Sequence, residues 1–418
     1  MEMKSCRLGD IAFITKLAGF EHTKYIQGNC VREKVDDTFI PLFIGKTIRD
    51  GKIDTNFDWY ISKKIADKLP RSFLKRKCLV LPYVGSLGDL AIFDASYEAL
   101  LGSNVAKIEL NQDCEFTEEF IYYFLKSPYG QSVLLKDEQG GIQKNITMES
   151  IRNVILPDIS VSNQKKITDV LSALDDKIAL NQRINRNLEE LARLIYDYWF
   201  VQFDFPDKNG KPYKTSGGKM VYNDQLKREI PAGWDSGSLS DIANITMGQS
   251  PDGSSYNEEG NGVVFYQGST DFGMRFPSVR QYTTAPTRFA KKGDILMSVR
   301  APVGAVNIAN EDCCVGRGLS AMNSKIGSIT HLYYIIDYFR HTFENRNSAG
   351  TTFGSITKDE LFALPVVIPN DFVLHKFEDI AKPIFDKQME LGKETVELTQ
   401  QRDRLLPLLM NGQVSVEN

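Results

Sequence analysis

The chain has 418 residues, of which 42% are hydrophobic and 25% are charged, so it has room for two or three domains with full cores. Its formal net charge of −4 argues against a protein that coats a polyanion with its whole surface. The chain has no apolar run long enough to span a membrane and no signal-peptide core, and its six scattered cysteines lack CxxC spacing, so we expect reduced thiols and a cytoplasmic location.

Residues 1–157 are predicted to form a first globular domain. Short apolar segments at 39–44, 78–84, 90–93 and 105–110 predict strands, and a helical pattern follows between 118 and 135. Strands with a few helices indicate an α+β domain.

From residue 163 to about 200 the pattern becomes that of one long amphipathic helix without Pro or Gly, within a spacer that we assign to 158–205. If Ile167 is heptad position a, the a positions are Ile167, Leu174, Asn181, Leu188 and Ile195. The d positions are then Val170, Lys177, Ile184, Leu191 and Tyr198. A polar Asn181 at an a position fixes the register of helix pairing.

Residues 206–229 are rich in Gly, Lys, Asp and Asn, which is typical of a linker or an exposed excursion. A second domain is predicted at 230–369 and a second spacer helix within 370–418. Pro383 marks a possible start or kink of that helix. Its a positions are Phe377, Ile384, Leu391, Leu398 and Leu405. We expect the two long helices to pair antiparallel within the chain, although each stripe could instead cover its own domain or meet another subunit.

The second half of the chain repeats the first. Residues 8–15 (LGDIAFIT) recur at 239–246 (LSDIANIT), and residues 140–147 (GGIQKNIT) recur at 350–357 (GTTFGSIT). Glycines and apolar strand residues are shared, whereas polar residues at the loop tips differ. This divergence on a common scaffold indicates two binding sites of one kind with different targets.

Two basic runs fall in equivalent parts of the repeats. Residues 61–80 contain seven Lys and Arg against one acid, and residues 275–300 contain six against one. Solvated surface charge explains either run alone, but the shared location favours a common role.

Motifs for catalysis and metal binding are missing from the sequence. Gly45-Lys46-Thr47 resembles the end of a P-loop, but Ile40 stands where its first glycine is required. None of the four histidines lies in ligand spacing with another His or a Cys, so no metal site is expected.

The amino-acid sequence between the two domains resembles that of the DNA-specificity subunit of type I restriction–modification systems. The resemblance is carried by residues 155–167, 171–178 (LSALDDKI), 185–191, 198–206 (YWFVQFDFP), 210–214, 216–218 and 230–234 (IPAGW), in that order. The second helix differs from this sequence, because residues 383–387 (PIFDK) stand where the first helix has Ser-Ala-Leu-Asp-Asp-Lys.

The resemblance implies an α+β fold with two target-recognition domains separated by two long antiparallel coiled-coil-like helices in a pseudo-two-fold arrangement. It implies a non-catalytic subunit that reads a bipartite target in double-stranded DNA. Its partners would be two methyltransferase (modification) subunits, which hold S-adenosylmethionine, and through them restriction subunits. A protein-binding assembly scaffold and a stand-alone enzyme are the alternative functions.

Under this interpretation, polar residues at the aligned loop tips are the candidates for reading bases. They are Lys46, Tyr83, Ser86, Lys144 and Asn145 in the first domain, and Ser269, Ser298, Arg300, Arg317, Thr351, Thr352 and Ser355 in the second. Arg300 is the strongest candidate because arginine can bind O6 and N7 of guanine together. A phosphate contact or a surface salt bridge is its alternative role.

Overall fold

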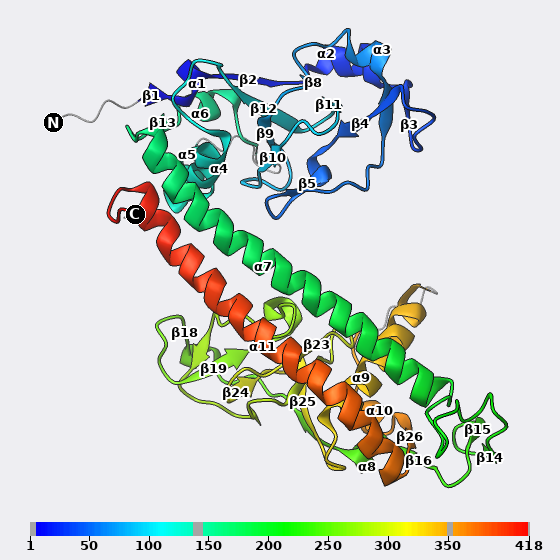
Figure 1. Cartoon of the computed structure of the whole chain (residues 1–418). Helices are drawn as coiled ribbons and strands as arrows, with labels where there is room; N and C mark the ends of the chain where they lie inside the picture. The colour runs from blue at the N-terminus through cyan, green and yellow to red at the C-terminus, as the bar shows by residue number, and fades with distance from the viewer. Residues whose placement is uncertain (1–5, 137–144, 349–353, 417–418) are drawn as a thin grey trace. The chain divides into compact units, whose positions relative to one another are not determined.

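The computed structural model describes residues 6–136, 145–348 and 354–416, with backbone alone at 341, 342 and 344–348. These residues fall into two compact units (Figure 1). Unit 1 comprises Met1–Lys177 and Leu398–Asn418, and unit 2 comprises Ile178–Glu397. The two longest helices, α7 (Val161–Tyr196) and α11 (Asp371–Met410), each contribute residues to both units.

Head 1, the globular part of unit 1 within residues 6–157, is built on two small sheets. A four-stranded antiparallel sheet has the order β10-β9-β12-β2, and a five-stranded sheet has the order β3-β7-β4-β11-β8 with β11 parallel to β4. Its elements are β1 (Cys6–Arg7), α1 (Leu8–Ile11), β2 (Ala12–Lys16), α2 (Gly19–Glu21), η1 (His22–Ile26), β3 (Cys30–Val31), β4 (Phe39–Phe43), η2 (Gly45–Thr47), β5 (Ile48–Arg49), β6 (Lys52–Ile53), β7 (Tyr60–Ser62), α3 (Lys63–Ala66), β8 (Phe73–Leu74), β9 (Cys78–Pro82), β10 (Ala91–Phe93), β11 (Ala99–Leu101), β12 (Val105–Leu110), α4 (Glu118–Lys126), α5 (Pro128–Leu134), α6 (Met148–Arg152) and β13 (Ile155–Leu156).

Head 2, the globular part of unit 2 within residues 228–369, repeats this topology. Its four-stranded sheet has the order β17-β25-β22-β23, and its five-stranded sheet has the order β18-β20-β19-β24-β21 with β19 parallel to β24. Its elements are β15 (Arg228–Pro231), β16 (Asp235–Ser238), α8 (Leu239–Ile242), β17 (Ala243–Met247), η4 (Gly253–Ser255), β18 (Tyr256–Asn257), β19 (Val263–Tyr266), η5 (Ser269–Asp271), β20 (Tyr282–Thr283), β21 (Phe289–Ala290), β22 (Ile295–Ser298), β23 (Val306–Ile308), β24 (Cys313–Val315), β25 (Leu319–Ser324), α9 (Ile329–Ser348), α10 (Lys358–Phe362) and β26 (Pro365–Ile368).

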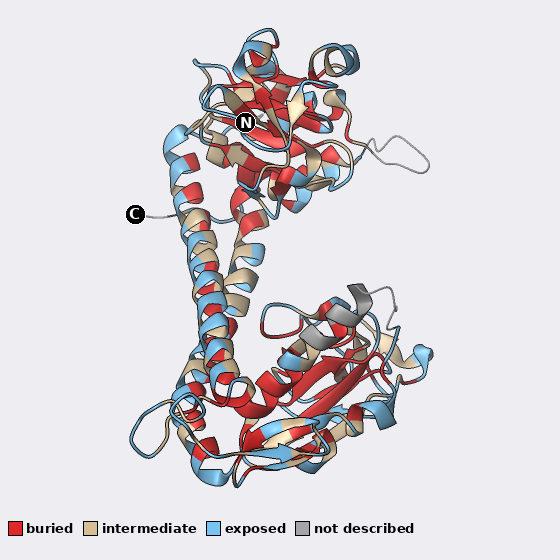
Figure 2. Cartoon of the chain, turned by 90° about the vertical axis from the view of Figure 1, so that its right-hand side faces the viewer, coloured by how far each residue is buried: buried red, intermediate tan, exposed pale blue. Residues whose placement is uncertain are grey.

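The predicted α+β class and the internal repeat are confirmed by this matching strand order. Figure 2 shows that buried residues concentrate in the sheets of each head and recur at intervals along the long helices. The predicted helical stretch 118–135 is divided into α4 and α5. Ser127 lies between them in extended backbone because Pro128 disfavours helical geometry in the preceding residue.

Residues 206–229, predicted as a linker or excursion, form an ordered excursion. It contains the hairpin of β14 (Met220–Asn223) and β15, and it follows η3 (Asp197–Val201) at the end of α7. Its entry is fixed by aromatic stacking, since the ring of Phe205 lies 4.9 Å from Trp234 and 4.7 Å from Tyr213. Stacked aromatic rings of this kind stabilise a segment beyond the area that they bury.

The long helices pair antiparallel in each unit. In unit 2, Asn181 contacts Glu394 and Glu189 contacts Gln388. Residue numbers therefore decrease along α11 in the direction in which they increase along α7. In unit 1 the equivalent contact joins Asp175 to Arg402. The predicted pairing within the chain is therefore found in both units.

Pro383 was predicted as a possible start or kink of the second helix. It is not the start, because α11 begins at Asp371 and continues past Pro383. Pro383 is exposed, so its missing N–H leaves no unpaired carbonyl in the core.

The second line of the helix seam differs from the prediction. Leu191 and Tyr198, assigned to d positions, are exposed, at 47% and 39%. The buried line instead follows the e positions of the same frame. These are Leu171, Ile178, Asn185 and Ala192 on α7, Trp199 on η3, and Ala381, Gln388 and Leu409 on α11. A side chain on a helix leans toward the N-terminus, so the residue that covers a given contact lies about one position later in the sequence. The d positions of a heptad frame are therefore easily assigned one position too early.

Candidate nucleic-acid interface

Four loops meet in head 1 at the ends of the central strands. The amide of Gly102 donates to the carbonyl of Phe43 at 2.7 Å, which joins the β11–β12 loop to the end of β4. The amide of Tyr83 donates to Asn104, and the amide of Ile146 donates to the carbonyl of Tyr83, at 3.0 and 2.9 Å. These bonds define loop group 1, which consists of residues 44–47, 83–88, 102–104 and 145–147.

Head 2 repeats the construction with equivalent backbone atoms. The amide of Gly316 donates to Tyr266 at 2.8 Å, that of Val299 donates to Gly318 at 2.9 Å, and that of Ile356 donates to Val299 at 3.0 Å. Loop group 2 therefore consists of residues 267–271, 299–304, 316–318 and 354–357.

One isolated β-bridge marks the same point in each group. Val84 bridges Asn145 in head 1, and Arg300 bridges Ser355 in head 2. The structure thus brings predicted loop-tip residues together in both heads, on backbone that is matched while the side chains differ.

The predicted residues of loop group 1 differ in how available they are. Ser86 and Lys46 are exposed, but Nζ of Lys46 lies 2.5 Å from the carboxylate of Asp58. Tyr83 and Asn145 are half-buried, and burial raises the pKa of the Tyr83 hydroxyl, so this group stays protonated and able to donate. Lys144 lies outside the described residues.

Sequence reasoning missed Lys16 at the end of β2. Its Nζ lies 4.3 Å from the centre of the Tyr83 ring, so the ammonium group of Lys16 lies at the edge of loop group 1. The equivalent position in head 2 is Met247, as the pairing of β2 with β12 and of β17 with β25 shows. A comparison of charge at equivalent strand ends would have identified Lys16.

In loop group 2, Arg300, Arg317 and Ser355 are exposed and Ser269 is half-buried. Neither arginine side chain forms an ion pair or a hydrogen bond within the part of the chain that the structure describes. Thr351 and Thr352 lie outside that part.

Ser298 requires a correction, because its side chain is 1% exposed. Its hydroxyl donates to the carbonyl of Pro302 and accepts from the amide of Ala305. Ser298 therefore shapes the loop that presents Arg300, and it is not available to read a base directly.

The two basic runs are partly neutralised by acids. Lys63 pairs with Glu98 at 2.5 Å and Arg76 with Glu109 at 3.2 Å, while Arg275 in the second run is buried against Glu189. Others also have acidic partners, namely Lys75, Lys77, Arg280 and Lys291. Within the part of the chain that the structure describes, the remaining basic residues of the two runs have no ion-pair partner. They are Lys64, Lys68, Arg71, Arg288, Lys292 and Arg300.

The predicted helix-pairing residues all lie on the buried or half-buried side of their helices. Four of them are buried, namely Ile167, Asn181, Phe377 and Leu391. Those half-buried are Leu174, Leu188, Ile195, Ile384, Leu398 and Leu405.

The described residues contain no cluster of three or more His, Cys, Asp or Glu side chains that could hold a metal ion. Burial raises the pKa of the Cys78 and Cys313 thiols to about 12, so both are protonated and poorly nucleophilic at neutral pH. In the same described ranges, every helix is too short or too polar to cross a bilayer.

Comparison with known proteins identifies a family that this chain matches. The model of the type I restriction modification DNA specificity domain matches residues 2–190 and 231–405. A Methanocaldococcus jannaschii protein, whose name assigns it to the MjaX type I restriction enzyme as specificity subunit, is 28% identical over 406 residues, 93% of this chain and 91% of its own. The HindI specificity subunit of Haemophilus influenzae is 24% identical and covers 67% of this chain and 73% of its own. The crystal structure of the type I restriction-modification system S subunit from M. genitalium is similar with a TM-score of 0.57 at 16% identity, over 98% of this chain and 96% of that one, which supports the fold.

Proposed function

Because the chain belongs to the type I restriction–modification DNA specificity family, we propose that it reads a bipartite target in double-stranded DNA. Head 1 reads one short sequence and head 2 reads another. The bases between the two half-sites are not read. Loop groups 1 and 2 are the proposed contact surfaces.

The observation that carries this proposal is the equivalence of the two bridges, Val84–Asn145 and Arg300–Ser355. The backbone of each bridge holds two loops at the same place, which favours a shared mode of docking. The side chains on that backbone differ, which favours two different sequences. Backbone contacts position a protein on DNA, and a few side chains that reach base edges supply the specificity.

The length of the spacer helix supports a bipartite target. At about 1.5 Å per residue, the 36 residues of α7 extend about 54 Å, which exceeds one turn of DNA of about 34 Å. A spacer helix longer than one turn of DNA is compatible with a target that is read in two parts.

We further propose that the chain is not itself catalytic and acts as a docking subunit. Two modification subunits would supply the methyltransferase chemistry and hold S-adenosylmethionine, and restriction subunits would join through them. This assignment follows the family.

Selection from random duplexes tests the proposal. The purified chain with its modification subunit is incubated with a random DNA library, and retained duplexes are sequenced. Enrichment of a motif with two specific blocks and a fixed gap is expected. Absence of any enriched motif, with the complex still assembled, would favour a protein-binding assembly scaffold. Methylation by the chain alone would indicate an enzyme.

A further inference from the structure

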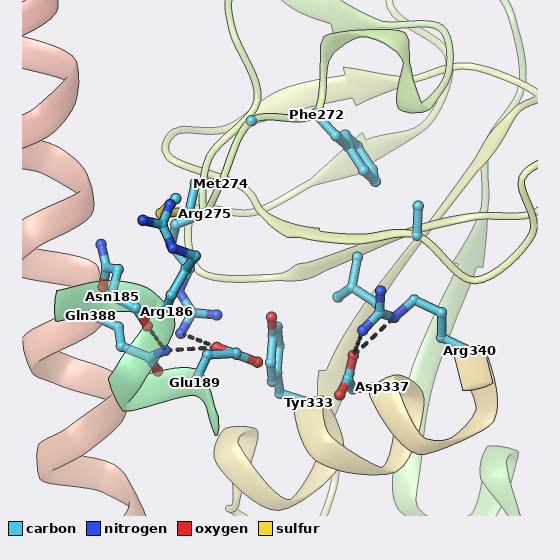
Figure 3. Close-up of a pocket in the computed structure, with 13 residues that line it drawn as sticks. Asn185, Arg186, Glu189, Phe272, Met274, Arg275, Tyr333, Asp337, Arg340 and Gln388 are labelled. Atoms are coloured by element: carbon cyan, nitrogen blue, oxygen red, sulfur yellow. Dashed lines mark hydrogen bonds and ion pairs between the residues drawn. The ribbon is translucent and has the colours of Figure 1, made fainter. Parts of the chain in front are cut away.

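Unit 2 contains a pocket of about 300 Å³ beside the helix seam (Figure 3), and none of its lining residues belongs to loop group 2. It is lined by α7, by Gln388 of α11, by the loop around Arg275, by α9 and by residues 305–306 at the start of β23. This volume lies at the lower end of the range for small-molecule sites.

Arg275 is an unusual wall residue because its side chain is only 3% exposed. Its Nη2 donates to Oε2 of Glu189 at 3.1 Å, and its guanidinium lies 4.9 Å from the ring of Tyr333. Its Nη1 is buried and forms no hydrogen bond of good geometry among the described residues, and the neighbouring Tyr334 hydroxyl, which helps to raise the pKa of the guanidinium, is also left unpaired. A buried charged donor without an acceptor is costly, so an acceptor placed beside it would be strongly favoured.

Two further donors, the guanidinium of Arg186 and the hydroxyl of Tyr333, belong to residues that line the same pocket. Arg186 is exposed on α7, and no ion pair of its side chain is found in the described part of the chain. Figure 3 shows Arg186 and Arg275 on one side of the pocket, with Tyr333 beside them and Asp337 and Arg340 opposite.

The acids of the pocket are already neutralised. Glu189 accepts from Arg275 and from Gln388, and Asp337 accepts from Arg340 at 3.0 Å. Three arginines against two acids leave one net positive charge on the walls. The net positive charge of the walls therefore favours binding of an anion.

We propose that this pocket binds a small oxyanion, the phosphate or carboxylate group of a small molecule. Its oxygens would accept from Nη1 of Arg275, from the guanidinium of Arg186 and from the hydroxyl of Tyr333. The amide oxygens of Asn185 and Gln388 in the same walls are buried without partners, so a ligand that also offers a hydroxyl donor fits better than a bare ion.

The test uses the full chain and three probes: inorganic phosphate, glycerol 3-phosphate and succinate. Isothermal titration at constant ionic strength is expected to give saturable binding of one molecule per chain. Tighter binding of the two phosphates identifies a phosphate site, and tighter binding of succinate identifies a carboxylate site. Lack of saturable binding by all three probes would overturn the proposal.

Variants place the ligand in the pocket. Arg186→Gln and Tyr333→Phe are each expected to weaken binding roughly tenfold, because each removes one donor to the anion. Arg183→Gln is the matched control, since Arg183 is exposed on the same helix and does not line the pocket. Equal binding by all three variants would contradict the assignment. Ligand should also slow amide hydrogen exchange at residues 305–306, and this readout does not depend on DNA binding.

Discussion

Asn181 on α7 donates a hydrogen bond from Nδ2 to Oε2 of Glu394 on α11 at 2.8 Å. Asn181 is completely buried, and its Oδ1 has no partner within the described chain. A polar residue in a helix seam finds its partner in only one alignment of the two helices, so this pair selects the register at some cost in stability.

Asn181→Leu is expected to lower the free energy of unfolding by about 1–3 kcal/mol, because the Glu394 carboxylate loses a buried donor. Asn181→Leu with Glu394→Leu should recover all of this loss and be at least as stable as the wild type, since both polar partners are then apolar. Urea unfolding followed by circular dichroism measures both changes. Asn187→Leu, at an exposed position of α7, is the control and should change stability by less than about 0.5 kcal/mol.

Arg300→Ala should relax sequence preference in one half-site only. If Arg300 binds a guanine edge, the variant loses about 1–3 kcal/mol of discrimination at one base position while the other half-site is read normally. Competition binding with single-base variants of the selected target measures this. A uniform loss on all sequences would identify a phosphate contact instead. Lys292, at the opposite end of β22, supplies the control Lys292→Ala, which should leave preference unchanged.

Lys16→Met should affect the other half-site. The change keeps the length of the side chain but removes the cation that lies over Tyr83, so binding should weaken and its dependence on salt should decrease by about one counterion. Binding measured between low and moderate salt gives the slope. Replacement of the equivalent Met247 by Leu is the matched change in head 2 and should leave the slope as in the wild type. An unchanged slope for Lys16→Met would remove Lys16 from the interface.

The fold was largely predictable because it follows from local patterns and from the repeat. Strand β12 matches its predicted range, 105–110, and α7 contains nearly all of the predicted helix. The e-position line of the seam was not predictable from apolar periodicity, because it includes the polar Asn185 and Gln388, which are buried.

The candidate site was predictable only in outline. Alignment of the repeats located the bridge at Arg300, since the backbone there is the same in both heads. Side-chain direction was not accessible from the sequence: Ser298 turns inward to bond its own loop. Lys16 joins loop group 1 through contacts between residues 67 positions apart, which no local pattern encodes.

His331 should make stability depend on pH. Burial lowers the pKa of its imidazole to about 3, and its ring lies 4.6 Å from that of Phe200. The unfolded chain binds a proton at this residue below pH about 6.5, whereas the folded chain does not until about pH 3, so stability falls as pH drops through this window. The loss attributable to His331 is about 2 kcal/mol at pH 5.

The variant His331→Phe keeps an aromatic ring in this position and removes the titration. The stability difference between pH 7.5 and pH 5 should therefore be smaller in His331→Phe than in the wild type by about 2 kcal/mol. Urea unfolding at both pH values measures this, and each protein is compared with itself, so any packing change from the larger ring cancels. His375→Gln, at an exposed position of α11, controls for the loss of a histidine and should behave as the wild type does. If His331→Phe kept the full pH dependence of the wild type, the loss of stability in acid would have to arise from groups other than His331.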